Sequence, residues 1–199
     1  YDLILTPDYA TEAERYQLAD KLSSKNRFIT PVHGFRRHDA LSILQVRDYF
    51  GCLENHRLIY VSAGGGGDEE ATRDLDVIIK TLSADPNNFL LVAYGPLYRG
   101  KKVYKQNVIP FSEANVSRFF GGIDFAVCAA GYNTYEELLA ARVPTFFYAQ
   151  KKGLDRQDER IKLGKEKLWN EVLEEVDPVH LRTAVETFTQ TSTASDIHD

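Results

Sequence analysis

The most chemically suggestive part of this sequence is a glycine between a strand-like and a helix-like segment. Phe125 to Ala130 is a short apolar run typical of a strand buried on both faces, and Gly131 ends it. We expect Asn133 or Thr134 to cap the helix that follows, because a short side-chain oxygen accepts from an otherwise orphan N–H group. The N–H groups and positive dipole end of such a helix suit a phosphate.

Two glutamates near the start of this helix allow two interpretations. Glu136 or Glu137 lies three residues after one of the two expected caps, which is the capping-box spacing. In the first interpretation, the carboxylates only stabilise the helix end and its dipole. In the second, the glutamate one turn into the helix reaches the hydroxyls of a ribose whose phosphates lie at the glycine.

A second glycine run, Gly64 to Gly67, directly follows the strand expected at Arg57 to Ser62. A helix is expected from Asp68 to Leu82, with an apolar stripe at helical spacing. This order is that of a phosphate-binding turn. The exact dinucleotide fingerprint is missing, however, and three acidic residues at the helix start would repel a phosphate. A tight turn with favourable dipole charges is therefore the alternative.

The alternation of strands and helices between residues 57 and 150 predicts an α/β fold. We expect a Rossmann-like parallel sheet with helices on both faces. Ligands of such folds bind at the carboxyl ends of the strands, where both glycine turns lie, so the turns should converge on one crevice. The other expected strands are Tyr1–Thr6, Asn88–Tyr94, Asn107–Phe111 and Thr145–Tyr148. The other expected helices are 11–22, 41–49, 112–120, 155–169, 171–175 and 180–188, with extended chain at 27–32.

The segment 123–150 resembles the donor-binding signature of the GT-B glycosyltransferases. It is most similar to the family of the peptidoglycan N-acetylglucosaminyltransferase, which makes the lipid-linked disaccharide. The resemblance is carried by Ala130-Gly131, Thr134, Glu137, Ala140-Ala141, Pro144 and Asp155-Arg156-Gln157.

This resemblance implies a role for each matching residue in binding a UDP-sugar. Glu137 would bind the ribose diol, Gln157 would bind the sugar, and Asp155 would belong to the same donor-binding site. Phe111 and Ser112 would receive the uracil, and Gly65 stands where related transferases carry a serine. The diphosphate would be held by Gly131, Tyr132, Asn133 and Thr134, opposite the turn of Gly64, Gly65 and Gly66.

The resemblance also implies a domain organisation. Residues 1–52 would be the end of an N-terminal domain and a linker, residues 53–189 the nucleotide-sugar donor-binding domain, and residues 190–199 a disordered tail. The rest of the N-terminal domain, with the acceptor site and the general base, would be absent. The chain would thus be the C-terminal half of an inverting glycosyltransferase that transfers a hexose-type sugar.

Composition excludes several other classes of protein. The formal net charge of −5 disfavours a general nucleic-acid binder. No apolar run could span a membrane and no signal peptide opens the chain, so a cytoplasmic setting is expected. The 5 histidines and 2 cysteines show no metal-ligand spacing, and we expect neither a metal nor a cofactor beyond the donor. Because the chain starts at Tyr1 and contains no methionine, we expect residues to be missing from it.

Two alternative functions are compatible with the same residues. One is a GT-B-fold enzyme that does not glycosylate, such as a UDP-sugar epimerase or hydrolase. The other is a non-catalytic subunit that supplies the donor-binding half of a two-chain transferase. The basic loop from Arg99 to Lys105 is either a solvated face or a contact with phosphates or an anionic membrane, and a lipid-linked acceptor would favour peripheral membrane contact.

Overall fold

The computed structural model of the chain describes residues 1–7, 20–67, 69–150, 155, 157–164, 170–173 and 175–195. The chain divides into two compact units, Tyr1–Gly34 and Phe35–Asp199. Within the second unit, the short helix α2 (Ile43–Phe50) packs against η3 (Val116–Gly122).

The first unit is built around two parallel strands. These are β1 (Ile4–Pro7) and β2 (Asn26–Ile29), and the helical turn α1 (Asp20–Ser23) precedes β2. The Oγ1 atom of Thr6 donates a hydrogen bond of 2.6 Å to Oδ1 of Asn26, which adds a side-chain link to the backbone ladder. The helix expected at residues 11–22 falls mostly outside the described residues.

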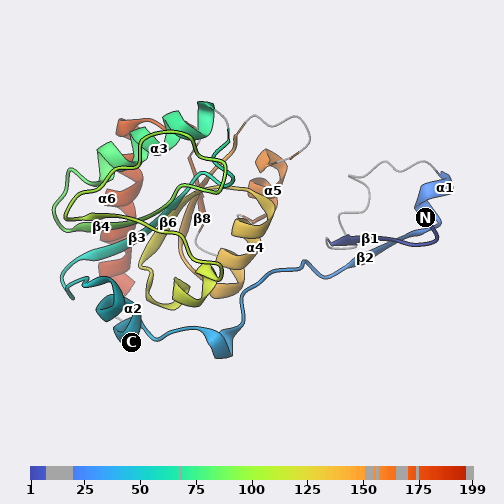
Figure 1. Cartoon of the computed structure of the whole chain (residues 1–199), viewed down its shortest axis with the longest axis horizontal. Helices are drawn as coiled ribbons and strands as arrows, with labels where there is room; N and C mark the ends of the chain where they lie inside the picture. The colour runs from blue at the N-terminus through green and yellow to red at the C-terminus, as the bar shows by residue number, and fades with distance from the viewer. Residues whose placement is uncertain are drawn as a thin grey trace. The chain divides into compact units, whose positions relative to one another are not determined.

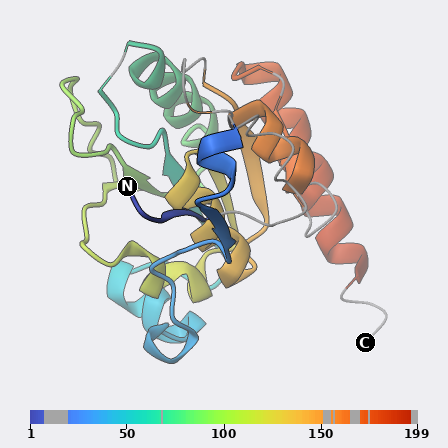
Figure 2. The ribbon, with the colours of Figure 1, turned by 90° about the vertical axis from the view of Figure 1, so that its right-hand side faces the viewer.

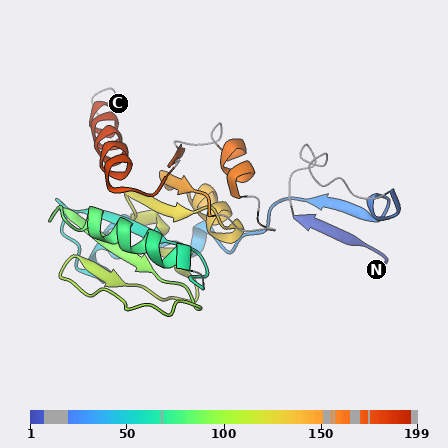
Figure 3. The same cartoon turned by 90° about the horizontal axis from the view of Figure 1, so that it is seen from above.

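The second unit contains a sheet of six strands in the order β5-β4-β3-β6-β7-β8, with every neighbouring pair parallel (Figure 1). Figure 3 shows the arrows of the central strands pointing the same way. The strands are β3 (Arg57–Ser62), β4 (Asn88–Ala93), β5 (Val108–Pro110), β6 (Phe125–Ala129), β7 (Thr145–Tyr148) and β8 (Asn170–Val172). The remaining helices are η2 (Arg37–Asp39), α3 (Glu69–Leu82), α4 (Tyr132–Ala141), α5 (Gln157–Gly164) and α6 (Pro178–Ser195).

Both faces of this sheet are buried. In β3, Ile59 and Val61 belong to the core under α3 and α6, whereas Leu58 and Tyr60 belong to the core under α2, η3 and α4. Figure 2 shows α3, in green, and α6, in red, on the same side of the sheet. Each fully buried aliphatic side chain contributes about 1.5–3 kcal/mol. The predicted α/β fold with helices on both faces is confirmed.

Two elements differ from the prediction. Residues 170–172 form β8 rather than part of a helix at 171–175, because the segment pairs with the open edge of β7 and Leu173 is buried in the core. The chain after Ser112 forms no helix until the 3-10 helix η3, in which Phe119 and Phe120 are buried. Burial and ladder pairing outweigh local helix tendency at both places. At the other end, α6 runs to Ser195, into the segment expected to be a disordered tail.

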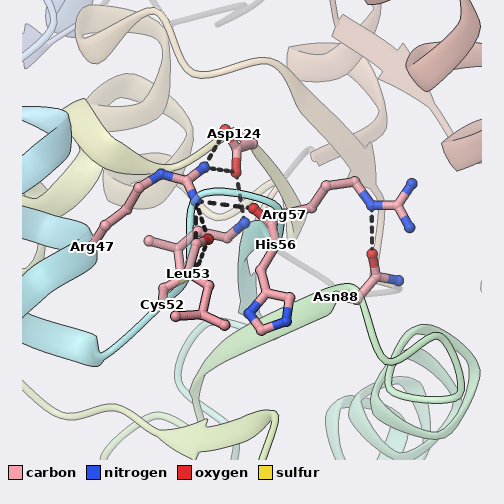
Figure 4. A network of polar contacts seen from close by, with 8 residues as sticks. Arg47, Cys52, Leu53, His56, Arg57, Asn88 and Asp124 are labelled. Atoms are coloured by element: carbon pink, nitrogen blue, oxygen red, sulfur yellow. Dashed lines mark hydrogen bonds and ion pairs between the residues drawn. The ribbon is translucent and has the colours of Figure 1, made fainter.

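A network of hydrogen bonds around the charged side chains of Arg47 and Asp124 lies at the amino-terminal edge of the sheet (Figure 4). The guanidinium of Arg47 makes two hydrogen bonds to Asp124, of 3.0 and 2.7 Å. It also donates to the carbonyls of Leu53 and His56, at 3.0 and 2.9 Å. Asp124 in turn accepts a hydrogen bond of 2.6 Å from the N–H of Leu58. Arg47 therefore ties α2 to the beginnings of β3 and β6.

Candidate functional site

The two glycine turns lie at the same edge of the sheet, on neighbouring strands. Strands β3 and β6 pair directly, with Ser62 opposite Cys128. Gly64 is two residues beyond Ser62, and Gly131 is three beyond Cys128. The ladder therefore brings both turns to the carboxyl edge, where ligands of parallel sheets bind.

The turn after β3 requires glycine for conformation and for space. Gly64 and Gly66 both have a φ of 72°, in the left-handed region that L side chains rarely adopt. A Cβ atom at Gly66 would lie 2.1 Å from the carbonyl oxygen of Tyr94. A Cβ atom at Gly64 or Gly65 would meet nothing within 4 Å. One side of the turn thus packs on the loop after β4, while the other side is open.

The turn after β6 passes directly into α4. Gly131 is itself the N-cap of the helix, and no side chain caps it, so the expectation of a cap at Asn133 or Thr134 is wrong. The reason is that the sheet ladder continues to Ala130, whose N–H bonds to the Tyr148 carbonyl at 3.0 Å, and the helix begins at once. Asn133 and Thr134 consequently lie inside the first turn.

This helix start offers backbone donors beside open space. The intrahelical bonds begin with the N–H of Tyr135, which donates to the Gly131 carbonyl at 2.9 Å. The N–H groups of Asn133 and Thr134 precede that bond, and a Cβ atom at Gly131 would meet nothing within 4 Å. Such donors at the positive end of a helix can bind an anion.

Glu137 lies one turn further along α4 and is half-buried. Its carboxylate is within electrostatic reach of β3, as the hydroxyl of Tyr60 shows. The pKa of Tyr60 is raised, first by burial, then by Cys128 and by Glu137, while a hydrogen bond with Ser62 partly offsets the shift.

Asp155 and Gln157 form a pair beside the end of β7. Nε2 of Gln157 donates to Asp155 Oδ2 at 2.8 Å, and its Oε1 accepts from the N–H of Gln150 at 3.0 Å. Gln157 is only 1% exposed. Both of its polar groups are thus bonded within the chain, so in this arrangement Gln157 links Gln150 to Asp155. Arg156, between them, lies outside the described residues.

Arg160 is a further polar residue of this site that the sequence analysis missed. It donates to the carbonyl of Ala130 and forms an ion pair of 2.9 Å with Asp155. The available signal was a basic side chain near the start of a helix, where the dipole disfavours positive charge.

Phe111 and Ser112 follow the outer strand β5, two strands away from β3. The ring of Phe111 is buried and packs edge-on against Phe50 and Phe119, with centroids 5.4 and 5.3 Å away. Ser112 is exposed. The structure therefore brings Gly64–Gly66 and Gly131–Thr134 together at adjacent strands, with Glu137 further along α4, and places the Phe111 ring in the core.

Two observations concern metals and membranes. Within the described ranges, no group of three His, Cys, Asp or Glu side chains gathers closely enough to hold a metal ion. None of the described helices has the length and apolarity needed to cross a membrane.

No protein-family model and no curated protein matches this sequence. Several solved structures are similar. The spinosyn rhamnosyltransferase SpnG in complex with thymidine diphosphate is 14% identical, with a TM-score of 0.59 over 94% of this chain and 48% of its own. The glycosyltransferase SnogD from Streptomyces nogalater is 17% identical, with a TM-score of 0.52 over 86% and 44%. The glycotransferase of kitacinnamycin is 17% identical, with a TM-score of 0.59 over 83% and 41%.

These similarities define the class of fold. The chain has the Rossmann-like fold of the GT-B glycosyltransferases, matching their C-terminal domain. It spans less than half the length of each of these solved structures.

Proposed function

We propose that this chain is the donor-binding half of an inverting GT-B glycosyltransferase that uses a UDP-sugar. The observation that carries the proposal is the pairing of β3 with β6, which brings two open glycine turns to one edge of the sheet. The resemblance to the peptidoglycan N-acetylglucosaminyltransferase family supports a uridine nucleotide, a hexose-type sugar and the inverting course.

The residues at this edge suit a nucleoside diphosphate. The N–H groups of Asn133 and Thr134 would hold the diphosphate, next to Gly131. As the acceptor hydroxyl attacks the anomeric carbon, the bond to the diphosphate oxygen breaks, and the helix start stabilises the negative charge that develops there. The hydroxyl proton passes to a base that we place in the N-terminal domain.

Glu137 would bind the two ribose hydroxyls. A carboxylate accepts two hydrogen bonds, and bonds to charged groups contribute about 1.5–3 kcal/mol. Its position on α4 is half-buried, so part of the side chain is accessible. Asp155 would contact the sugar, and Gln157 would reach it after exchanging one of its bonds within the chain.

A donor-binding subunit of a two-chain transferase is the second candidate. Among the described residues of the first unit, β1 and β2 form a two-stranded parallel sheet, and Leu3 and Leu5 are each 55% exposed. Parallel sheets are normally covered on both faces and two strands alone are marginal. A complementary N-terminal-type chain, or further residues of this one, would cover these side chains.

A lipid-linked acceptor would bring the protein to a membrane surface. The side chains of Arg99, Lys101 and Lys102 are exposed on the loop after β4. Such a run attracts anionic headgroups.

Calorimetric titration with UDP tests the proposal. We expect Glu137→Ala to weaken UDP binding about tenfold or more, because it removes a charge-assisted contact. Glu136→Ala is the matched control, since it removes the same charge from the neighbouring position of α4 and should leave the affinity unchanged. An equal affinity for wild type and Glu137→Ala would reject the ribose role.

The wider proposal has its own test. If the wild-type protein binds neither UDP nor thymidine diphosphate, the donor-binding function is wrong. Product analysis with a UDP-sugar and the protein joined to its N-terminal partner would separate transfer to an acceptor from epimerisation or hydrolysis.

A further inference from the structure

Arg160 contacts two segments that are distant from each other in the sequence. One nitrogen, Nη1, donates to the carbonyl of Ala130, the residue before the glycine turn. The other, Nη2, lies 2.9 Å from Oδ1 of Asp155. The guanidinium carbon is 5.6 Å from the centroid of the Tyr132 ring, in a cation–π arrangement. All three contacts converge on the residues flanking Gly131 and on the loop after β7.

Helix stability does not explain this arginine. Arg160 is the fourth residue of α5, close to its amino end, where a positive charge opposes the dipole. Its side chain is 19% exposed, so most of it has lost contact with water. Burial of a charge is costly unless it is paired and hydrogen-bonded. The contacts to Ala130 and Asp155 provide that compensation.

The contacts of Arg160 continue into the predicted sugar-binding segment. The second carboxylate oxygen of Asp155 accepts from Gln157 at 2.8 Å, and Gln157 accepts from the Gln150 N–H at 3.0 Å. An unbroken series of bonds therefore runs from Ala130 after β6, through Arg160, to Gln150 after β7. It links the predicted diphosphate turn to the predicted sugar contacts.

We propose that Arg160 is a positioning residue that fixes the glycine turn and the Asp155–Gln157 pair in one arrangement for a nucleoside diphosphate-sugar. This inference rests on the proposed function. The positioning role requires the planar guanidinium group of arginine, because its two terminal nitrogens bond a carbonyl and a carboxylate at the same time. A lysine keeps the charge but offers a single nitrogen.

Hydrogen–deuterium exchange of the unliganded protein tests the structural part. Arg160→Met should increase the exchange rate of the amides of Gly131 and Tyr135, which donate backbone hydrogen bonds of 2.9 Å, about tenfold or more, which is the loss expected for one charge-assisted hydrogen bond. Arg182→Met, on the exposed side of α6, is the matched control and should leave these amides unchanged. Unchanged exchange in Arg160→Met would overturn the positioning role.

Titration with UDP and with thymidine diphosphate tests the functional part. We expect Arg160→Met and Arg160→Lys both to bind about tenfold more weakly, with Arg160→Lys keeping the wild-type unfolding temperature. If Arg160→Met does not fold, Arg160→Lys carries both measurements. Wild-type affinity in Arg160→Lys would overturn the requirement for the guanidinium group.

The two proposals can fail separately. If the wild type binds nucleotide and both variants bind equally well, the role of Arg160 is wrong and the donor-binding function stands. If the wild type binds no nucleotide, the donor-binding function is wrong, and so is the functional part of this inference. The exchange measurement then decides only whether Arg160 orders the turn.

Discussion

The amino edge of the six-stranded sheet and the glycine turns at its carboxyl edge are built from different chemistry. At the amino edge, charged side chains bond to one another and to the backbone, as Arg47 does with Asp124 and Arg57 with Asn88 at 2.8 Å. At the carboxyl edge, the central strands β3 and β6 lead into glycine turns, and a Cβ atom at Gly64 or Gly131 would meet nothing within 4 Å. One edge therefore stabilises the fold, and the other leaves backbone donors for a ligand.

The direction of the strands explains this division. In a parallel sheet with connecting helices, the amino ends of the helices gather at the carboxyl edge and carry unpaired N–H groups. Substitutions at the amino edge should therefore change stability and leave nucleotide binding intact. Substitutions at the open positions of the carboxyl edge should do the reverse.

The largest expected effect is that of Gly66→Ala. It is an exception to the difference between the two edges, because it lies at the carboxyl edge and yet should reduce the stability of the fold. Left-handed backbone costs an L residue about 1–2 kcal/mol, and the clash with the Tyr94 carbonyl adds about 1–3 kcal/mol. Urea denaturation should show a loss of about 3 kcal/mol. Gly65→Ala, whose Cβ meets nothing within 4 Å, is the control and should lose less than about 1 kcal/mol.

Arg47→Met should cost about 2–3 kcal/mol of unfolding free energy, because Asp124 and the Leu53 and His56 carbonyls lose the hydrogen bonds that the guanidinium donates. UDP affinity, measured on the folded protein by calorimetry, should stay within about twofold of wild type. A large loss of affinity at unchanged stability would show that the two edges are not independent.

Gly131→Ala is the carboxyl-edge counterpart of Arg47→Met, since it should change UDP binding and leave stability nearly unchanged. Its φ of −62° suits alanine and its surroundings are open, so stability should change by less than about 1 kcal/mol. The added methyl group would occupy the space next to the helix N–H groups and should weaken UDP binding about tenfold, or about 1.4 kcal/mol. Unchanged affinity would mean that the diphosphate does not lie at this turn.

The smallest expected effect concerns Asp74, a buried acid on α3 below the carboxyl edge. Burial raises its pKa, and the nearby Arg73 partly offsets the shift. An acid whose pKa is higher in the folded state binds its proton more tightly there, so stability falls as pH rises through the folded pKa. Asp74→Asn should remove this fall. Urea denaturation at pH 4 and pH 7 should show a gain relative to wild type of about 1 kcal/mol at most, larger at pH 7.

Strands that are buried on both faces of the sheet could be predicted from the sequence. The bounds of β3 and β7 are confirmed at every residue. The apolar run of β3 ends just before the glycine turn, and that of β7 begins directly after Pro144. The edge strand β8 could not be predicted, since Asn170–Val172 is extended only because it pairs with β7. Local patterns do not report such distant pairing.

The candidate site could be predicted only in part, because some of its features are local in the sequence and others depend on contacts between distant residues. The glycine turns are local signals, and fold logic brings them to one edge. The role of Arg160 depends on contacts with Ala130 and Asp155, 30 residues away in the first case. The bonds that occupy Gln157 likewise depend on where α5 packs, which no short motif encodes.

The direct pairing of β3 with β6 has a consequence for how this protein could diversify. Because one hydrogen-bonded ladder sets the span between Gly64 and Gly131, that span is inherited with the strands themselves. The residues after β7 are tied to the glycine turn only through side chains, by Arg160 and Asp155, and side chains can change without any change in the strands. We therefore expect homologues to differ in their donor sugar through substitutions after β7, while the backbone contacts proposed for the diphosphate stay the same.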